Sequence, residues 1–158
     1  MLQIRNAKSG ATPVDVTQSI YVTIAERQTI AQDLVYYLVE LKSNVSQNSL
    51  YFIPTSVVAS NGRYTKLTFT VIDNNETADP ENGRFKFYGA TGGVNEFPMG
   101  FYSYNIYEQT SSTNINPNLA GKLLQEGTAY VYSYDGNMEE VEPEFKEWDN
   151  APQQFVYE

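Results

Sequence analysis

Apolar residues alternate with polar ones along several short stretches of the chain. Within residues 64–72, Leu67, Phe69 and Val71 share one face, and polar or amphipathic residues occupy the other. A period of two is the pattern of a β-strand with one buried face. Apolar residues recur at the same spacing in residues 14–24. We therefore expect both stretches to be half-buried strands.

Residues 34–41 fit two patterns. Ile30, Leu34 and Leu38 have the spacing of one face of a helix. Residues 35–39, however, read VYYLV, and β-branched and aromatic residues lose side-chain freedom on a helix. We predict a strand here.

Further strand-like stretches are separated by residues that favour turns. They lie at residues 50–53, 84–88, 100–108 and 122–132. About seven short strands joined by such turns predict an all-β fold, an immunoglobulin-like antiparallel β-sandwich. Residues 2–5 would supply an eighth strand, which leaves a jelly roll as the alternative.

Composition changes after the last predicted strand. Residues 135–158 contain eight acidic residues and one lysine, a net charge of −7, whereas the first 134 residues carry −2. The large apolar residues of this acidic stretch are spaced singly: Phe145, Trp148, Phe155 and Tyr157. Isolated aromatic anchors in an acidic strip are typical of an arm that folds on binding a neighbour. We expect a sandwich domain over residues 1–132 and an extended acidic C-terminal arm over residues 133–158; a solubilising tail is the other interpretation.

Two residue types are missing from the 158 residues: there is no cysteine and no histidine. Thiol nucleophiles, zinc–sulfur sites and Ser-His-Asp triads are therefore excluded, together with the usual general base at neutral pH. Carboxylates remain. Glu108 and Glu126 lie near strand ends, but nothing in the sequence brings them together as the pair that glycoside hydrolysis needs.

The acidic loop at residues 73–83 is the best candidate for a metal site. Its oxygen donors, Asp73, Asn75, Asp79 and Glu81, resemble those of a calcium loop. The glycine and glutamate that an EF-hand requires are absent, and turns favour the same residue types. We interpret the loop as an Asx-rich turn and predict no enzyme activity, no catalytic residue, no cofactor and no metal.

The chain contains 13 tyrosines, which suit a half-buried sheet surface. We expect Tyr102 and Tyr104 to be structural, with a hydroxyl locking a corner of the sandwich. An exposed aromatic platform for carbohydrate is the alternative. The net charge of −9 argues against nucleic acid as a partner, and no stretch approaches the roughly 20 apolar residues of a membrane span.

Several stretches together resemble a known kind of protein. The most specific are GFYSYNIYEQT at residues 100–110 and LLQEG at residues 123–127. Their order resembles small single-domain virion proteins of tailed bacteriophages, especially the crAss-like and related phages of Bacteroidota hosts. This resemblance implies an immunoglobulin-like structural module of a capsid or neck, made in the host cytoplasm and resident in the virion.

These observations lead to one expectation of function and one alternative. We expect a non-enzymatic virion structural protein, either a capsid auxiliary or decoration protein or a head–tail neck component. It would form oligomers or bind other virion proteins through its sheet edges and through the arm. The alternative is a carbohydrate- or receptor-binding β-sandwich module. No signal peptide is visible in the sequence.

Overall fold

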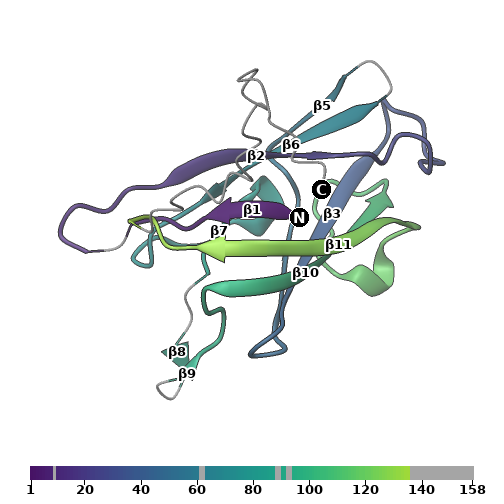
Figure 1. Cartoon of the computed structure of the whole chain (residues 1–158). Helices are drawn as coiled ribbons and strands as arrows, with labels where there is room; N and C mark the ends of the chain where they lie inside the picture. The colour runs from purple at the N-terminus through teal and green to yellow at the C-terminus, as the bar shows by residue number, and fades with distance from the viewer. Residues whose placement is uncertain (9, 61–62, 88–89, 92–93, 136–158) are drawn as a thin grey trace, which may run out of the picture.

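The computed structural model describes residues 1–8, 10–60, 63–87, 90–91 and 94–135, and these ranges form an all-β structure with two main sheets (Figure 1). One sheet has five strands in the order β1-β11-β10-β3-β4. Its strands are β1 (Leu2–Arg5), β11 (Leu123–Tyr132), β10 (Gly100–Gln109), β3 (Tyr36–Ser43) and β4 (Ser49–Phe52).

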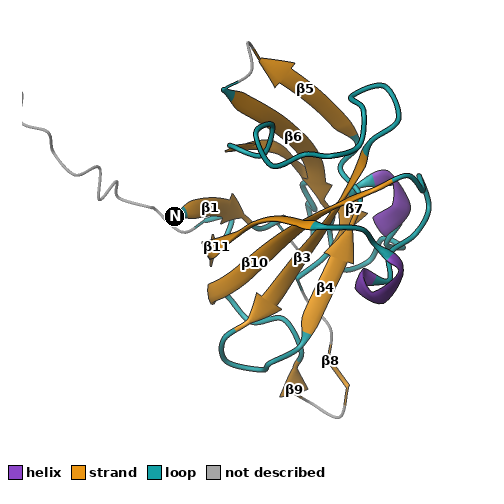
Figure 2. Ribbon diagram, turned by 90° about the vertical axis from the view of Figure 1, so that its right-hand side faces the viewer, coloured by secondary structure: helices purple, strands orange, loops and turns teal. Residues whose placement is uncertain are grey.

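The second sheet has β6 (Tyr64–Val71) at its centre. One edge of β6 pairs with β2 (Val16–Val22), and the other is shared by β5 (Ser56–Ser60) and β7 (Arg84–Phe85). A separate small hairpin joins β8 (Ala90–Thr91) to β9 (Val94–Asn95). Two short 3-10 helices, η1 (Pro80–Asn82) and η2 (Pro117–Leu119), lie in connecting loops (Figure 2).

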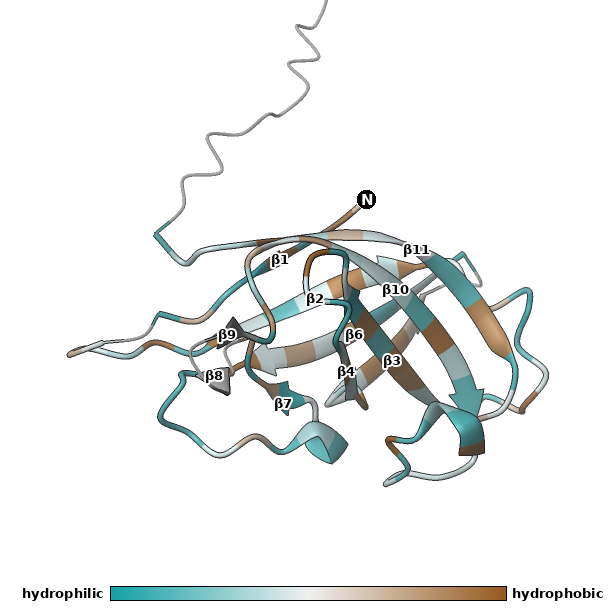
Figure 3. Ribbon diagram, turned by 90° about the horizontal axis from the view of Figure 1, so that it is seen from below, coloured by the Kyte–Doolittle hydropathy of each residue, from teal (hydrophilic) through white to brown (hydrophobic). Residues whose placement is uncertain are grey.

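The two sheets pack face to face around one core, which makes the fold sandwich-like. Phe52 of β4 lies against Phe69 of β6, with 5.1 Å between the ring centroids, and stacks on Phe85 of β7 at 4.3 Å. The predicted inward residues of β6 are all fully buried, and so are Tyr37 and Val39 of β3. Buried and more exposed residues alternate along β6, and hydrophobic and hydrophilic bands are visible along β3 (Figure 3). The prediction of a strand at residues 34–41 is confirmed, although β3 begins at Tyr36.

Two features depart from the expected antiparallel sandwich of about seven strands. First, β1 runs parallel to β11, and β7 runs parallel to β6. β1 and β11 are far apart in sequence, and the loop containing η1 turns the chain before β7, so neither pair is a hairpin that would force antiparallel pairing. Second, the described ranges contain eleven strands, because β5, β8 and β9 were not predicted and residues 2–5 do form a strand.

Candidate interaction surface

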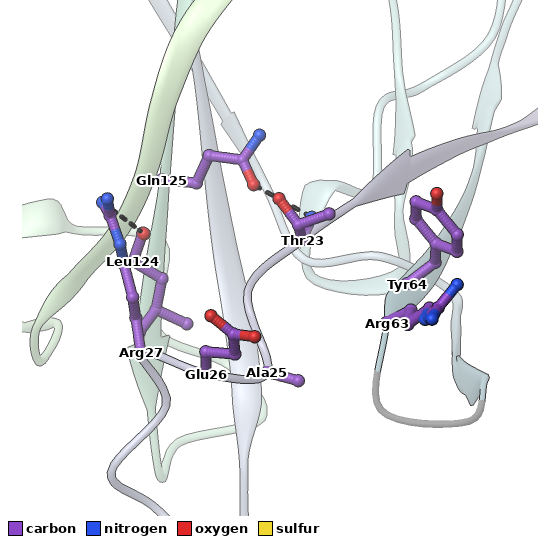
Figure 4. A pocket seen from close by; sticks show the side chains of 8 residues that line it. All are labelled: Thr23, Ala25, Glu26, Arg27, Arg63, Tyr64, Leu124 and Gln125. Atoms are coloured by element: carbon purple, nitrogen blue, oxygen red, sulfur yellow. Dashed lines mark hydrogen bonds between the residues drawn. The ribbon is translucent and has the colours of Figure 1, made fainter.

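A cleft of about 470 Å³ opens at one end of the sandwich, where three connecting segments meet. The cleft is lined by residues from the segment after β2, from the start of β6 with the residue before it, and from the start of β11: Thr23, Ala25, Glu26, Arg27, Arg63, Tyr64, Leu124 and Gln125. Figure 4 shows Arg27, Leu124 and Gln125 on one side of the cleft and Arg63 with Tyr64 on the other. We call this the loop-end cleft.

Hydrogen bonds between distant segments hold the walls of the loop-end cleft. The amide of Thr23 donates to Oε1 of Gln125 at 3.1 Å, and Nε2 of Gln125 donates to the hydroxyl of Tyr104 at 2.7 Å. The guanidinium of Arg27 donates to the carbonyl of Leu124 at 3.3 Å. The cleft is therefore framed by fixed backbone, while the side chain of Arg63 is exposed and makes no hydrogen bond or ion pair with the described residues.

A buried carboxylate fixes the loop that forms one wall of the cleft. Glu108 is 1% exposed, and it accepts hydrogen bonds from the amides of Thr29 and Ile30 at 2.8 and 3.1 Å and from the Thr29 hydroxyl. Burial works to raise the pKa of Glu108, but these donors and the nearby Lys122 hold it below the ordinary value of 4.5. Glu108 is thus an ionised structural anchor with its oxygens occupied.

Beside the cleft, large side chains are exposed on the outer face of the four-stranded sheet. Tyr21 is 61% exposed, Val58 52% and Tyr64 53%. Lys66 pairs with Tyr21 on one side and with Val58 on the other, so these side chains lie in one row across β2, β6 and β5. Tyr64 is two residues before Lys66 and shares its face. We call Tyr21, Val58, Tyr64 and Lys66 the tyrosine patch.

The tyrosine patch borders an open sheet edge. β5 pairs with β6 on one side, and within the described ranges no backbone hydrogen bond engages its other side. Proteins usually protect an edge strand from pairing by placing charged residues or proline in it. The sequence of β5, SVVAS, contains neither. Aromatic side chains and arginine next to an unprotected edge are typical of protein–protein contact surfaces.

The outer face of the five-stranded sheet carries a different cluster, around Glu40. Ser49, Tyr51, Asn105 and Tyr107 all donate to its carboxylate, at distances of 2.9 to 3.3 Å. Partial burial works to raise the pKa of Glu40, but the four donors together hold it below 4.5. Burial and the Glu40 charge raise the pKa of Tyr51 and Tyr107, so both rings are neutral and fixed on this face.

The acidic residues singled out in the sequence do not form a catalytic or metal-binding group. Asn105 pairs with Glu126 on the outer face, whereas Glu108, three residues further along β10, points inward; the two glutamates therefore lie on opposite sides of the sheet. In the acidic loop, Asp73 accepts bonds from the two amides that follow it, as an Asx turn does. No group of three or more acidic side chains able to hold a metal occurs in the described ranges.

Tyr102 and Tyr104 both lie inside the fold. The hydroxyl of Tyr102 donates to the carbonyl of Pro98 at 2.7 Å, and burial raises the pKa of Tyr102 to about 12, a rise that a hydrogen bond with Ser43 partly opposes. Tyr104 supports the cleft through Gln125, as described above. Both rings are therefore part of the core and are not available as an exposed aromatic platform.

The proposed arm anchors Phe145, Trp148, Phe155 and Tyr157 lie outside the described residues. Tyr134, one residue before the end of the described ranges, is held against the rest of the fold. Nη2 of Arg5 donates to the carbonyl of Tyr134 at 2.8 Å, and the guanidinium lies 4.3 Å from the centroid of the Tyr134 ring. The last described residues of the chain therefore lie beside β1.

No protein-family model, no curated protein and no solved structure matches the chain. Of the helical segments in the described part, none has the length and apolar character needed to cross a membrane. The sequence did not predict the tyrosine patch, although the alternation within residues 64–72 puts Tyr64 and Lys66 on the face opposite Leu67, Phe69 and Val71. Val58 was missed because β5 was not predicted.

Proposed function

We propose that the chain is a non-enzymatic structural protein of a bacteriophage particle, serving as a capsid auxiliary protein or a neck component. The observation that carries this proposal is the tyrosine patch next to the open edge of β5. Exposed rings on a sheet face, beside unpaired backbone groups, provide both apolar area and hydrogen bonds for a neighbouring protein. The virion context is supported only by the resemblance carried by residues 100–110 and 123–127.

The state of the two hydrogen-bonded carboxylates supports the non-enzymatic part of the proposal. Glu108 and Glu40 have pKa values below the ordinary range, and their oxygens are occupied by neighbouring donors. A general acid or base needs instead a pKa near the working pH and access to substrate. Both groups are better explained as structural anchors.

We also propose that the fold is immunoglobulin-like. In that fold one sheet contains strands G, F, C and C′ and the other contains B, E and D. The sheet order β11-β10-β3-β4 corresponds to G-F-C-C′, and the order β2-β6-β5 corresponds to B-E-D. The strands also follow one another along the chain in the order of these letters. The hydrogen bond from Tyr102 to Pro98, four residues upstream, resembles the tyrosine corner of such domains. On this proposal the loop-end cleft lies among the loops that immunoglobulin domains use for binding.

Quantitative mass spectrometry of purified particles tests the proposed function. The copy number of the chain is measured relative to the major capsid protein. We expect a fixed ratio: a high copy number for a decoration protein, or about a dozen copies for a component on the cyclic neck axis. Absence from particles, with the chain present in infected cells, would contradict the virion role.

The Glu40 cluster favours a second candidate, a carbohydrate-binding module. Tyr51 and Tyr107 are held by Glu40, half-buried, on the outer face of the sheet next to the amide of Asn105, and sugars bind to such combinations of rings and polar groups. A glycan array distinguishes the candidates. Specific binding that Tyr51→Ala and Tyr107→Ala each remove, with Phe101→Ala as a surface control on the same sheet, would favour this function over the structural one.

A further inference from the structure

The direction of the backbone groups of β5 can be read from its partner strand. Thr68 of β6 accepts from the amide of Thr55, and Thr70 donates to Gly83, so the even-numbered residues of β6 direct their groups towards this edge. Thr68 is in register with Ser56, and Lys66 with Val58. The intervening residues, Val57 and Ala59, therefore direct their N–H and C=O groups away from β6.

These outward groups have no backbone partner among the described residues. The side chain of Val57 packs against the core, and that of Ala59 is exposed and small. An incoming strand would thus find two donors and two acceptors in extended geometry, with no bulky or charged side chain blocking it. The edge of β5 can therefore accept a further strand.

One segment of the chain outside the described ranges has the character of a strand. Residues 153–157, QQFVY, follow Pro152 and contain no charge, glycine or proline, and Phe155 and Tyr157 alternate with polar or aliphatic residues. The 17 residues before it, 136–152, contain six acidic residues and one lysine. Fully extended, 17 residues span at most about 60 Å, which is ample for reaching a neighbouring domain.

Charge also suits this segment to the β5 edge. β5 carries no acidic residue, and the basic side chains next to it are Lys66, in register with Val58, and Arg63, immediately before β6. The acidic residues that precede 153–157 would pass these cations. This attraction between opposite charges would speed the association of two copies at low salt. At higher salt it would be screened and would weaken.

The exit point of the arm favours donation to another copy. The described part of the chain ends beside β1, and the amide of Arg5 in β1 donates to Gln18 of β2, so residues 136–158 start from the β2 side of the sandwich. β5 occupies the other edge of the four-stranded sheet, and Figure 2 shows it away from β1. Donor and acceptor on opposite sides give a head-to-tail contact, which builds rings or rows of subunits.

We propose that residues 153–157 of one copy add as a strand to the free edge of β5 in a second copy. This inference rests on the proposed assembly function and names its partner. The donated strand would place its side chains alternately over the core and beside the tyrosine patch.

Sedimentation velocity of the full chain tests the inference. Ala59→Pro removes an outward N–H that β6 does not use, whereas the control Ala59→Thr keeps that N–H. We expect wild type and Ala59→Thr to self-associate as concentration rises, and Ala59→Pro and Val156→Pro to raise the dissociation constant at least about tenfold. Unchanged circular dichroism would show that Ala59→Pro is folded. A wild type that stays monomeric, or an Ala59→Pro chain that associates like wild type, would overturn the inference.

Cross-linking identifies which copy supplies the strand. Because the chain has no cysteine, Val58→Cys and Val156→Cys each carry one thiol. Mixed under oxidising conditions, these two chains should form a hetero-disulfide, and Lys42→Cys with Val156→Cys should not. A double variant that closes within one chain, while the mixture stays unlinked, would assign the strand to its own domain and overturn donation between copies.

The particle measurement keeps the two proposals separate. If Ala59→Pro self-associates like wild type and enters particles at the wild-type copy number, the strand donation is wrong and the virion role stands. If self-association depends on Ala59 but the chain is absent from particles, the virion role is wrong and the strand donation stands.

Discussion

The amide of Thr29 donates to the buried carboxylate of Glu108 at 2.8 Å, across 79 positions of sequence. This contact ties the loop after β2 to the end of β10 and so fixes one side of the loop-end cleft. The backbone of Glu108 is also closely packed. The amide of Gly121 donates to the Glu108 carbonyl at 2.8 Å, and a Cβ on Gly121 would lie 2.6 Å from that oxygen. The cleft is therefore part of the folded framework.

Replacing this carboxylate should destabilise the protein and loosen the loop. Glu108→Gln keeps the size of the side chain but removes its charge, so the amides of Thr29 and Ile30 and the Thr29 hydroxyl lose a carboxylate acceptor, and one of its two oxygens is replaced by an NH2 group. We expect the free energy of unfolding to fall by about 1–3 kcal/mol, measured by urea denaturation. Hydrogen exchange at those two amides should accelerate. Glu126→Gln, an exposed change on the opposite face of the sheet, should stay within about 0.5 kcal/mol of wild type.

The same carboxylate should make stability depend on acid pH. Its pKa is lowered in the folded state, so its contribution is present above the ordinary value of 4.5 and is lost as pH falls through the lower folded value. Urea denaturation between neutral and acid pH should show wild type losing more stability than Glu108→Gln. Parallel losses in the two proteins would contradict an ionised anchor.

Gly127 should be intolerant of a side chain because of Tyr104. A Cβ at Gly127 would lie 2.7 Å from Cε1 of the Tyr104 ring, closer than packed atoms allow. We expect Gly127→Ala to cost about 1–3 kcal/mol. In a Tyr104→Leu background the added methyl meets a smaller side chain, so its cost should fall. Equal costs in both backgrounds would show that the contact is not responsible.

The sequence predicts most strands because their patterns reflect burial. Leu67, Phe69 and Val71 alternate and are all fully buried, and residues 36–41 lie in a strand despite their partly helical spacing. β5 was missed because SVVAS is short, follows soon after Pro54 and lacks alternation of apolar and polar residues. Its pairing with β6 is a tertiary contact.

The interaction surface was less accessible to sequence reasoning. Tyrosines occur throughout the chain, and nothing local separates buried Tyr102 from exposed Tyr64 except the direction of each strand face. The role of Glu108 was also hidden, because its donors lie 78 and 79 residues away. A charged residue at an inward position of a strand is the one signal that was available: Glu108 follows Tyr102, Tyr104 and Ile106 at the same period.

The central claim, assembly through the tyrosine patch, is tested most directly by particle incorporation of a patch variant. A chain with Tyr21→Ser and Tyr64→Ser is supplied during infection, and its copy number in purified particles is measured by mass spectrometry. The matched control carries Thr17→Ala and Thr70→Ala on the same sheet face, away from the patch. We predict that the patch variant keeps its fold but is lost from particles, while the control is incorporated. A folded patch variant at the wild-type copy number would contradict the account.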